Sequence, residues 1–599
     1  VPDDVTILDI PETYNGKNIV KITGDAFIGL NNLVEVYIPK NVYLIDWRAF
    51  KDCVNLTTVH FPADTDISKI GFEAFKGCSE LKQLEAEGGA SIWKKIEIIY
   101  GDAFAESGMT AQFEKDGGLY YWGDILMGTE QTITDDYADS ELTEINIRQN
   151  TRVIAGYALR NCTKVASIYL PDSVAYLWQE PFPKSSALET ISFPAGVKEL
   201  NEYNGLLPGT IKEIEVRGEG VRYKEIGGCL VDMQDSVLLA SEKSAEDLPE
   251  GIKVIGVRAF TNKEAETIVI PSSYTTIRDG AFNGSTISYL NIPDSVGVLA
   301  EEICAGCTNL ESVTFGAKSP AVKEMFFSSM QSTVLNQISV SEENENMYDY
   351  NNILYDKKTN TLIYVPEGIT GEITFPEQVT EIASDAFAGE YANITSIIFH
   401  DGITVYPARL PKVSERIHLG AGANVVPCEG ADWGEVFAEA IGEAGENAPQ
   451  ITVSESNPYI YADGKGNIVR IADNMALYFA KQEGEIFYIP DNIAGVADEN
   501  GAKQSMKDIT HKATGVDIGA AFAQAGMLLY DMANHVDYID ITVSEENPYY
   551  YTDEYGNLIS KDDHIAIYFR LRPEDEESNV FYISDTIAGI ADDNGAAIS

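Results

Sequence analysis

Positively charged residues are scarce in this chain of 599 residues. The chain contains 42 lysines and arginines against 94 aspartates and glutamates, which gives a formal net charge of −52 at pH 7. A surface with this excess of carboxylates repels nucleic acid and anionic lipid. The sequence therefore predicts no nucleic-acid partner, and it favours either simple solubility or attraction for basic ligands.

Long apolar runs and cysteines are also few. No run of 18 apolar residues occurs, so the sequence predicts no membrane insertion within this chain. Seven cysteines are too few, and odd in number, for a disulfide scaffold. The chain begins Val1-Pro2-Asp3 without Met or an apolar leader, which fits either a mature chain whose signal was removed or a cloning boundary.

Motifs that would indicate catalysis or a bound metal are missing as well. The six histidines include no His-Glu-x-x-His pair, and there is no Gly-x-Ser-x-Gly elbow or phosphate-binding glycine loop. Asp498–Gly501 and Asp592–Gly595 gather oxygen atoms on a turn, as calcium loops do, but they lack EF-hand spacing, so an ordinary Asn-Gly turn is favoured. The sequence predicts no enzyme activity, no cofactor and no metal site.

One phrase recurs along the chain. It reads Ala-Phe-x-Gly/Asp-Cys-x-x-Leu-x-x-Val/Ile-x-Phe/Ile-Pro from Ala49, returns at Ala74, and has a partial copy from Ala305. Phe27, Phe50 and Phe75 are 23 and 25 residues apart. A period of about 20 to 29 residues with this apolar spacing is typical of a leucine-rich-repeat solenoid, in which coils bury their apolar faces by stacking.

Each repeat contains two apolar segments. In the first, Val36 and Ile38 alternate with polar residues and Pro39 follows, which predicts a strand that the proline closes. In the second, Ile45 is followed by Ala49 and Phe50, which predicts a short strand and one tight helical turn. The small Ala lets neighbouring coils approach, and the Phe fills the space between layers.

The cysteines follow the repeat. Four of them occupy the same position of the phrase: Cys53, Cys78, Cys162 and Cys307. A small apolar side chain suits a buried position of this kind. We therefore expect these cysteines to be reduced and buried, and we interpret Cys304-x-x-Cys307 in the same way rather than as a redox or metal pair.

A second unit interrupts the coils. Three short strands joined by turns are predicted at 338–344, 352–356 and 361–366, with related copies from 451 and 541 and weaker forms at 117–126 and 227–239. After residue 420 the coils enlarge, and Asp432 and Asp517 each open an Ala-rich stretch as a candidate N-cap. We predict a solenoid with hairpin insertions at 1–420 and enlarged, tandemly duplicated units continuing it at 421–599. A separate small α+β domain is the alternative for 421–599.

The repeated phrases and the Ser-Glu-Glu-Asn-Pro-Tyr hairpin unit resemble the BspA-like leucine-rich repeats of bacterial cell-surface and secreted proteins. The resemblance covers residues 20–410 and reaches 421–599 only through the hairpin units. It implies a β-rich solenoid, built as a right-handed leucine-rich-repeat coil with short helical turns and inserted β-hairpin units. It also implies an extracellular or cell-surface location, a role in adhesion or ligand binding, and no catalytic residues.

The function predicted from these observations is that of a non-catalytic extracellular binding or adhesion protein. Such a protein presents its repeat surface to a protein or glycan ligand. Two alternatives stay open: a passive structural stalk or spacer at the cell surface, and, less favoured, a secreted hydrolase.

The strand pattern also predicts where a ligand binds. The apolar residues of Leu-x-x-Val-x-Ile point into the core, so the residues between them point outward from the sheet. Stacked coils then align tyrosines and carboxylates in a ladder that suits a protein surface or a glycan; the alternative is a merely solvated sheet face. The predicted binding residues are Tyr37, His60, Glu85, Tyr169, Ser192, Glu215, Tyr289, Asn291 and Thr314.

Overall fold

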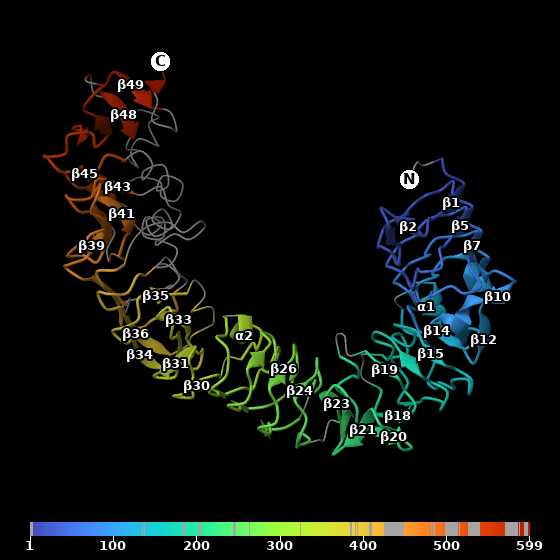
Figure 1. Cartoon of the computed structure of the whole chain (residues 1–599). Helices are drawn as coiled ribbons and strands as arrows, with labels where there is room; N and C mark the ends of the chain where they lie inside the picture. The colour runs from blue at the N-terminus through green and yellow to red at the C-terminus, as the bar shows by residue number, and fades with distance from the viewer. Residues whose placement is uncertain are drawn as a thin grey trace. The chain divides into compact units, whose positions relative to one another are not determined.

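The fold is a β-solenoid, seen in a computed structural model (Figure 1). The structure describes residues 4–423, 449–496, 513–524, 540–568 and 585–598, except for short gaps at 135, 137, 184–186, 202–204, 243–246, 263, 324, 333, 384–385, 388, 390, 392, 406–409, 481, 483–485, 514, 586 and 592–596. The chain divides into two compact units, residues 1–332 (unit 1) and 333–599 (unit 2). The stretch opened by Asp432, both predicted Asn-Gly turns and Cys428 lie outside the described residues.

The first set of parallel strands in unit 1 carries the Leu-x-x-Val-x-Ile pattern. In most of these strands the apolar residues are buried and the residues between them are exposed or half-buried, as the period of two requires. The set forms three sheets: β1 (Ile7–Asp9), β5 (Glu35–Tyr37), β7 (Thr58–Phe61) and β9 (Gln83–Ala86); β16 (Ser167–Tyr169), β18 (Thr190–Pro194) and β20 (Glu213–Arg217); and β25 (Thr267–Ile268), β27 (Tyr289–Ile292) and β29 (Ser312–Phe315).

The second set of strands in unit 1 comes from the Val-x-x-Ile segments. These strands are mostly two residues long and also pair in parallel from coil to coil. They are β4 (Lys21–Ile22), β6 (Leu44–Ile45), β8 (Lys69–Ile70) and β11 (Ile98–Ile99); β14 (Ile125–Thr129), β15 (Val153–Ile154), β17 (Tyr176–Leu177) and β19 (Glu199–Leu200); and β23 (Val237–Ser241), β24 (Val254–Ile255), β26 (Thr276–Ile277) and β28 (Val298–Leu299).

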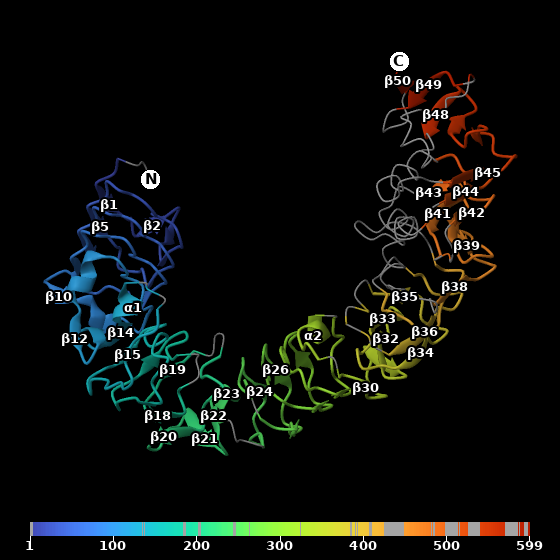
Figure 2. The same cartoon turned by 180° about the vertical axis from the view of Figure 1, so that it is seen from behind.

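Unit 2 repeats the parallel arrangement (Figure 2). Strand pairing crosses residue 420, because Ile417 pairs with Ile451 in the same sheet; the predicted boundary at that residue stays a prediction. The face strands are β34 (Gly371–Thr374), β36 (Ile394–Ile398), β37 (Arg416–Leu419) and β38 (Gln450–Val453), and then β42 (Ile486–Ile489), β44 (Gly515–Ile518) and β45 (Asp540–Val543).

Three-stranded antiparallel units interrupt the coils where the sequence predicts hairpins. The last strand of each unit pairs in parallel with the next strand of the second set, so the solenoid continues beyond the unit. The strands are β12 (Glu114–Asp116) and β13 (Leu119–Trp122) with β14; β21 (Tyr223–Ile226) and β22 (Cys229–Asp232) with β23; β31 (Met347–Tyr350), β32 (Ile353–Asp356) and β33 (Thr361–Tyr364), followed by β35 (Glu381–Ile382); β39 (Ile460–Ala462), β40 (Ile468–Arg470) and β41 (Met475–Tyr478), followed by β43 (Gly495–Val496); and β46 (Tyr550–Thr552), β47 (Leu558–Ser560) and β48 (Ile565–Tyr568), followed by β49 (Gly589–Ala591) and β50 (Ala597–Ile598).

The composition of these units differs from the prediction in one respect. The segments predicted as first strands from 338, 451 and 541 instead form β30 (Gln337–Val340), β38 and β45, which belong to the face sheets and not to the hairpins. The true first strand follows a buried asparagine. Asn457 accepts hydrogen bonds from the backbone N–H of Tyr459 (2.9 Å) and Ile460 (3.0 Å), and donates to the carbonyls of Gly420 and Ala423 (both 2.9 Å). This one side chain turns the chain into the hairpin.

Helix is confined to short pieces in the described residues. The predicted turns around Ala-Phe are single hydrogen-bonded turns, such as the bond from Ala49 N–H to the Asp46 carbonyl. They do not extend into helix because Arg48 and Asp52 are left-handed, at φ 50° and 61°. The expected N-cap at Asp517 is wrong, since Asp517 lies in strand β44 between buried Val516 and Ile518. The helices are α1 (Glu130–Ile133), α2 (Met325–Ser328), η1 (Ile92–Lys95) and η2 (Gly108–Gln112); the short strands β2 (Thr13–Tyr14), β3 (Lys17–Asn18), β10 (Ala90–Ser91) and β30 (Gln337–Val340) complete the elements.

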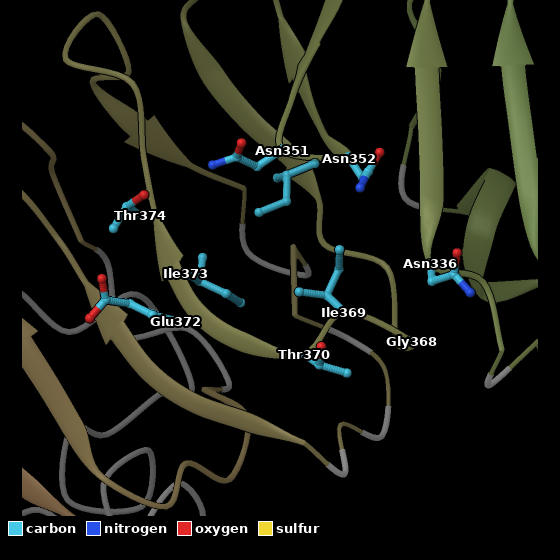
Figure 3. A pocket seen from close by; sticks show the side chains of 10 residues that line it. Asn336, Asn351, Asn352, Gly368, Ile369, Thr370, Glu372, Ile373 and Thr374 are labelled. Atoms are coloured by element: carbon cyan, nitrogen blue, oxygen red, sulfur yellow. The ribbon is translucent and has the colours of Figure 1, made fainter.

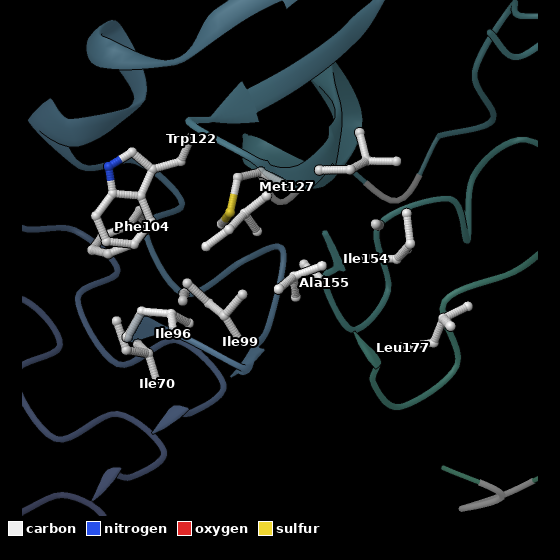
Figure 4. Close-up of a cluster of buried hydrophobic side chains, with 14 of the residues drawn as sticks. Ile70, Ile96, Ile99, Phe104, Trp122, Met127, Ile154, Ala155 and Leu177 are labelled. Carbon is white, nitrogen blue, oxygen red and sulfur yellow. The ribbon is translucent and has the colours of Figure 1, made fainter. Parts of the chain in front are cut away.

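A stack of phenylalanines lies along the core of unit 1. The ring centroids of Phe27, Phe50, Phe75 and Phe104 follow one another at 5.2, 5.4 and 5.5 Å. Trp122, from the first hairpin, packs edge-on against Phe104 at 5.3 Å and ends the stack. Figure 4 shows these two rings beside the buried aliphatic residues of the adjoining coils. The Phe position of the repeat therefore joins successive coils, as the sequence predicts.

The cysteine position of the repeat is buried, as expected, and it also forms a hydrogen bond. The Cys53 thiol donates to the Phe27 carbonyl (3.1 Å), and the Cys78 thiol donates to the Phe50 carbonyl (3.0 Å). Ser285 occupies the same position and donates to the Phe260 carbonyl at 2.8 Å. Cys and Ser can therefore both serve at this position, although Leu30 fills it in the first coil without a hydrogen-bond donor.

Candidate ligand-binding face

The predicted binding residues lie on the first set of parallel strands of unit 1. In the first sheet Tyr37 pairs with His60, and His60 pairs with Glu85. In the second, Tyr169 pairs with Ser192, and Ser192 pairs with Glu215. In the third, Tyr289 lies on β27 two residues before Asn291, which pairs with Thr314.

Strand register thus aligns the predicted residues, but in three separate ladders. The first sheet ends where β9 pairs with the antiparallel strand β10. In the coil between β9 and β16, Ile145 and Ile147 are buried but form no strand. The hairpin β21–β22 follows β20 in the same way. The face is therefore divided into ladders of three or four parallel strands each.

The first ladder is an aromatic pair surrounded by carboxylates. The rings of Tyr37 and His60 stack with centroids 4.4 Å apart and planes 16° from parallel. The Tyr37 hydroxyl donates to Glu35 at 3.0 Å, and this bond raises the pKa of Tyr37 above its usual value. His60 Nε2 lies 3.4 Å from the same carboxylate. With Asp9 and Glu85 in the adjoining positions, this ladder suits a ligand with positive charge or several hydrogen-bond donors.

The second ladder is organised by an arginine that the sequence reasoning missed. The Arg217 guanidinium lies over the Tyr169 ring, 3.8 Å from its centroid. It also donates to Ser192 Oγ (2.5 Å), to the Leu170 carbonyl (2.5 Å) and to Asp172 (2.9 Å). Ser192, which also bonds Glu215, is buried, so it positions its neighbours rather than facing a ligand. Arg217 follows Glu213 and Glu215 at the period of two, and that spacing could have revealed it.

The third ladder is less tightly connected. The Tyr289 hydroxyl lies 3.5 Å from Glu311, a residue that the prediction also left out. Asn291 is exposed and Thr314 is half-buried, and they pair across β27 and β29. A comparable polar face in unit 2 was missed because the prediction stopped at residue 314. There Glu372, Ser396, Arg416 and Gln450 occupy one line across β34, β36, β37 and β38.

Metal-holding clusters and membrane-spanning helices are both absent from the part of the chain that the structure describes. No group of three or more His, Cys, Asp or Glu side chains within the described ranges is placed to hold a metal ion. In the same residues, no helix has the length and apolar character that crossing a bilayer requires. The ladders offer aromatic faces, carboxylates and amides on a rigid sheet, which is the chemistry of recognition.

Comparison with known proteins agrees with the repeat pattern. A family model described as the BspA type leucine rich repeat region matches in six copies, over residues 6–116, 132–213, 241–355 and 369–410. These ranges cover more than half of the chain. The chain belongs to the BspA-type leucine-rich repeat family. Members of this BspA-type family are repeat proteins, and the resemblance recognised from the sequence is confirmed.

Solved structures of similar bacterial proteins also match the BspA-type chain. A leucine rich cell surface protein from Faecalibacterium prausnitzii is 19% identical, with 56% of this chain and 88% of that chain covered and a TM-score of 0.27. A leucine-rich repeat protein from Bacteroides ovatus is 18% identical, with coverages of 70% and 79% and a TM-score of 0.25. The pneumococcal vaccine antigen PcpA is 15% identical, with coverages of 63% and 85% and a TM-score of 0.25. None of the curated proteins matches the chain.

Proposed function

We propose that this chain is a non-catalytic binding or adhesion protein, secreted or displayed at the cell surface, and that it holds a protein or glycan ligand on the ladders of unit 1. The observation that supports this most is the exposure of the ladder tyrosines. Tyr37, Tyr169 and Tyr289 are 41%, 52% and 43% exposed, whereas the phenylalanines of the same three sheets are buried. When a ligand covers a half-exposed aromatic ring on a rigid strand, the buried ring contributes strongly to the binding free energy.

Charge indicates the kind of ligand. The carboxylates of Asp9, Glu35, Glu85, Glu213 and Glu215 lie on or beside the ladders, against the single guanidinium of Arg217. Arg217 is already paired with Asp172. A basic protein surface, or a glycan that donates hydroxyl hydrogens, complements such a face. We expect the affinity for a basic ligand to fall as salt concentration rises, because the attraction is largely between exposed charges.

The test is a triple variant of the ladder tyrosines. The full chain is screened against a glycan array and a panel of purified proteins of differing net charge, and each hit is then measured with Y37S/Y169S/Y289S. We expect binding to fall at least about a hundredfold, as loss of central aromatic anchors produces. The melting curve should change little, because the three side chains are half exposed.

A matched control replaces three tyrosines of comparable or greater exposure outside the ladders. Tyr14, Tyr43 and Tyr459 are 70%, 41% and 44% exposed, so Y14S/Y43S/Y459S removes as much aromatic surface. Binding should survive in this control. Undiminished binding by the ladder variant would place the site elsewhere, and an absence of any ligand across both panels would favour the stalk or spacer alternative.

A further inference from the structure

A hollow of about 410 Å³ lies within unit 2, beside the turn that joins β31 and β32. It is built from three stretches that are apart in the sequence, and it shares no residue with the ladders of unit 1. Figure 3 shows Asn351 and Asn352 on one side of it and Ile369, Thr370 and Ile373 on the other. The lining residues are Asn336, Asn351, Asn352, Ile353, Gly368, Ile369, Thr370, Glu372, Ile373 and Thr374.

The walls of this hollow are fixed by backbone contacts. The Gly368 N–H donates to the Leu335 carbonyl at 2.7 Å, and a Cβ on Gly368 would lie only 2.7 Å from that oxygen. On the opposite side, pairing of Tyr350 with Ile353 closes a two-residue turn. A cavity with such walls exists before a ligand arrives, and its size lies within the range of small-molecule sites, about 300–1,000 Å³.

The turn itself is unusual within this chain. Asn351 and Asn352 are both left-handed, at φ 50° and 63°. The equivalent turns of the first two hairpins are Gly117-Gly118 and Gly227-Gly228, with φ between 56° and 85°. Glycine adopts this conformation without the strain that a side chain brings. The third hairpin therefore carries two amides at a turn where the first two hairpins have glycines.

Those amides have no structural use that the fold reveals. Neither Asn351 nor Asn352 forms a side-chain hydrogen bond to the described part of the chain. At the first hairpin Leu142 lies 2.8 Å from where a Cβ of Gly118 would be, whereas nothing lies within 4 Å of one at Gly227 in the second. The third hairpin differs from both because its turn adds donors and acceptors to the edge of a hollow.

The chemistry of the lining selects the ligand. Ile353 and Ile373 are almost fully buried, so the apolar surface of the hollow comes mainly from the half-buried Ile369, and most of the exposed lining is polar. The amides, with Thr370 and Thr374, supply both donors and acceptors around it. Glu372 is the only charged residue among the described residues of the lining, which disfavours phosphates and carboxylates. A wholly apolar ligand would leave the amides and hydroxyls without water or partners.

We propose that this hollow binds a neutral pyranose, either a free sugar or the end of a glycan chain. A pyranose ring presents C–H groups on one face, which Ile369 can cover, and hydroxyls at its rim that donate and accept. Planar amides suit neighbouring hydroxyls, since each amide can donate to one and accept from another. The site is separate from the ladders proposed above.

The test uses a variant that removes both amides and keeps the turn. N351G/N352G restores the Gly-Gly sequence of the first two hairpins, so the turn should form at least as readily as before. The purified full chain is titrated by ligand-observed NMR with methyl glycosides of glucose, galactose, mannose and N-acetylglucosamine. We expect at least one to bind, and its affinity to fall by about tenfold or more in N351G/N352G.

Three controls make the result decisive. N360G changes another left-handed asparagine, at φ 54° and outside the hollow, and should bind the sugar as wild type does. Y37S/Y169S/Y289S should also keep sugar binding, which separates this site from the ladders. E372Q should alter sugar affinity only a few-fold. If no glycoside binds, if N351G/N352G binds undiminished, or if the hollow instead takes methylamine or a lysine amide and loses it in E372Q, the proposal is overturned.

Discussion

Replacing Phe50 by alanine should open the first coils of unit 1 locally while the rest of the chain keeps its protection against hydrogen exchange. Phe50 is fully buried, with Phe27 and Phe75 stacked on either side of its ring at 5.2 and 5.4 Å. Deleting a buried Phe side chain costs about 3–5 kcal/mol. Since each ~1.4 kcal/mol is a factor of ten, protection in these coils should fall by roughly two to three and a half powers of ten.

The chain provides its own comparison for this variant. Leu159 occupies the Phe position in a later coil and is fully buried there. F50L keeps most of the apolar volume and loses two aromatic contacts, each worth about 0.5–1.5 kcal/mol. We therefore expect F50L to cost roughly 1–3 kcal/mol, clearly less than F50A. F27A should also cost less, because Phe27 is only half-buried and lies at the end of the stack.

The assay is hydrogen exchange followed by mass spectrometry on the full chain. In a solenoid each coil is stabilised mainly by its neighbours, so the loss should be confined to the coils around Phe27, Phe50 and Phe75. Peptides from the hairpin strands β31, β32 and β33 serve as an internal reference. Equal losses in F50A and F50L, or a loss spread evenly over the chain, would show that the Phe stack does not hold the coils together.

Three further predictions concern single side chains. Burial raises the pKa of Cys162 to about 12, so this thiol should stay protonated and unreactive in the native chain at pH 8. Because the thiol of the unfolded chain ionises first, the free energy of unfolding should decline as the pH rises from the ordinary thiol range towards 12. Thiol titration of the native protein should therefore label at most Cys428, and labelling of any of the six buried cysteines without denaturant would contradict their burial. N457A should cost about 2–4 kcal/mol because four hydrogen bonds of a buried amide are lost, and this cost should appear as faster exchange in β39, β40 and β41. N360G, at the half-buried end of the turn between β32 and β33, is its control. R217K should weaken protection around Tyr169 nearly as much as R217A, because an ammonium group cannot stack on the ring and reach three acceptors together; full recovery by lysine would mean that charge alone matters.

Periodicity was enough to predict what repeats. The positions of Phe50 and Cys53 in the core, the strand at 58–61 and its outward-facing residues all follow from spacing, because every coil meets the same environment on both sides. For the same reason Tyr37, His60 and Glu85 could be aligned without a structure, and parallel pairing confirms their register. The hairpin units were also located by their repeated turns. Their first strands were not, since the role of Asn457 depends on carbonyls of the preceding coil.

Only the tertiary structure decided what depends on non-repeating contacts. The division of the face into three ladders arises where hairpins replace strand pairing, and no single repeat shows it. Arg217 reaches across to the ring of Tyr169, 48 positions earlier in the sequence. The hollow at Asn351 and Asn352 exists because Gly368 holds one segment against another. A repeat has the same local geometry in each coil because the coils on either side of it are alike. A site forms where the neighbouring coils differ, and that difference appears only when the coils are stacked.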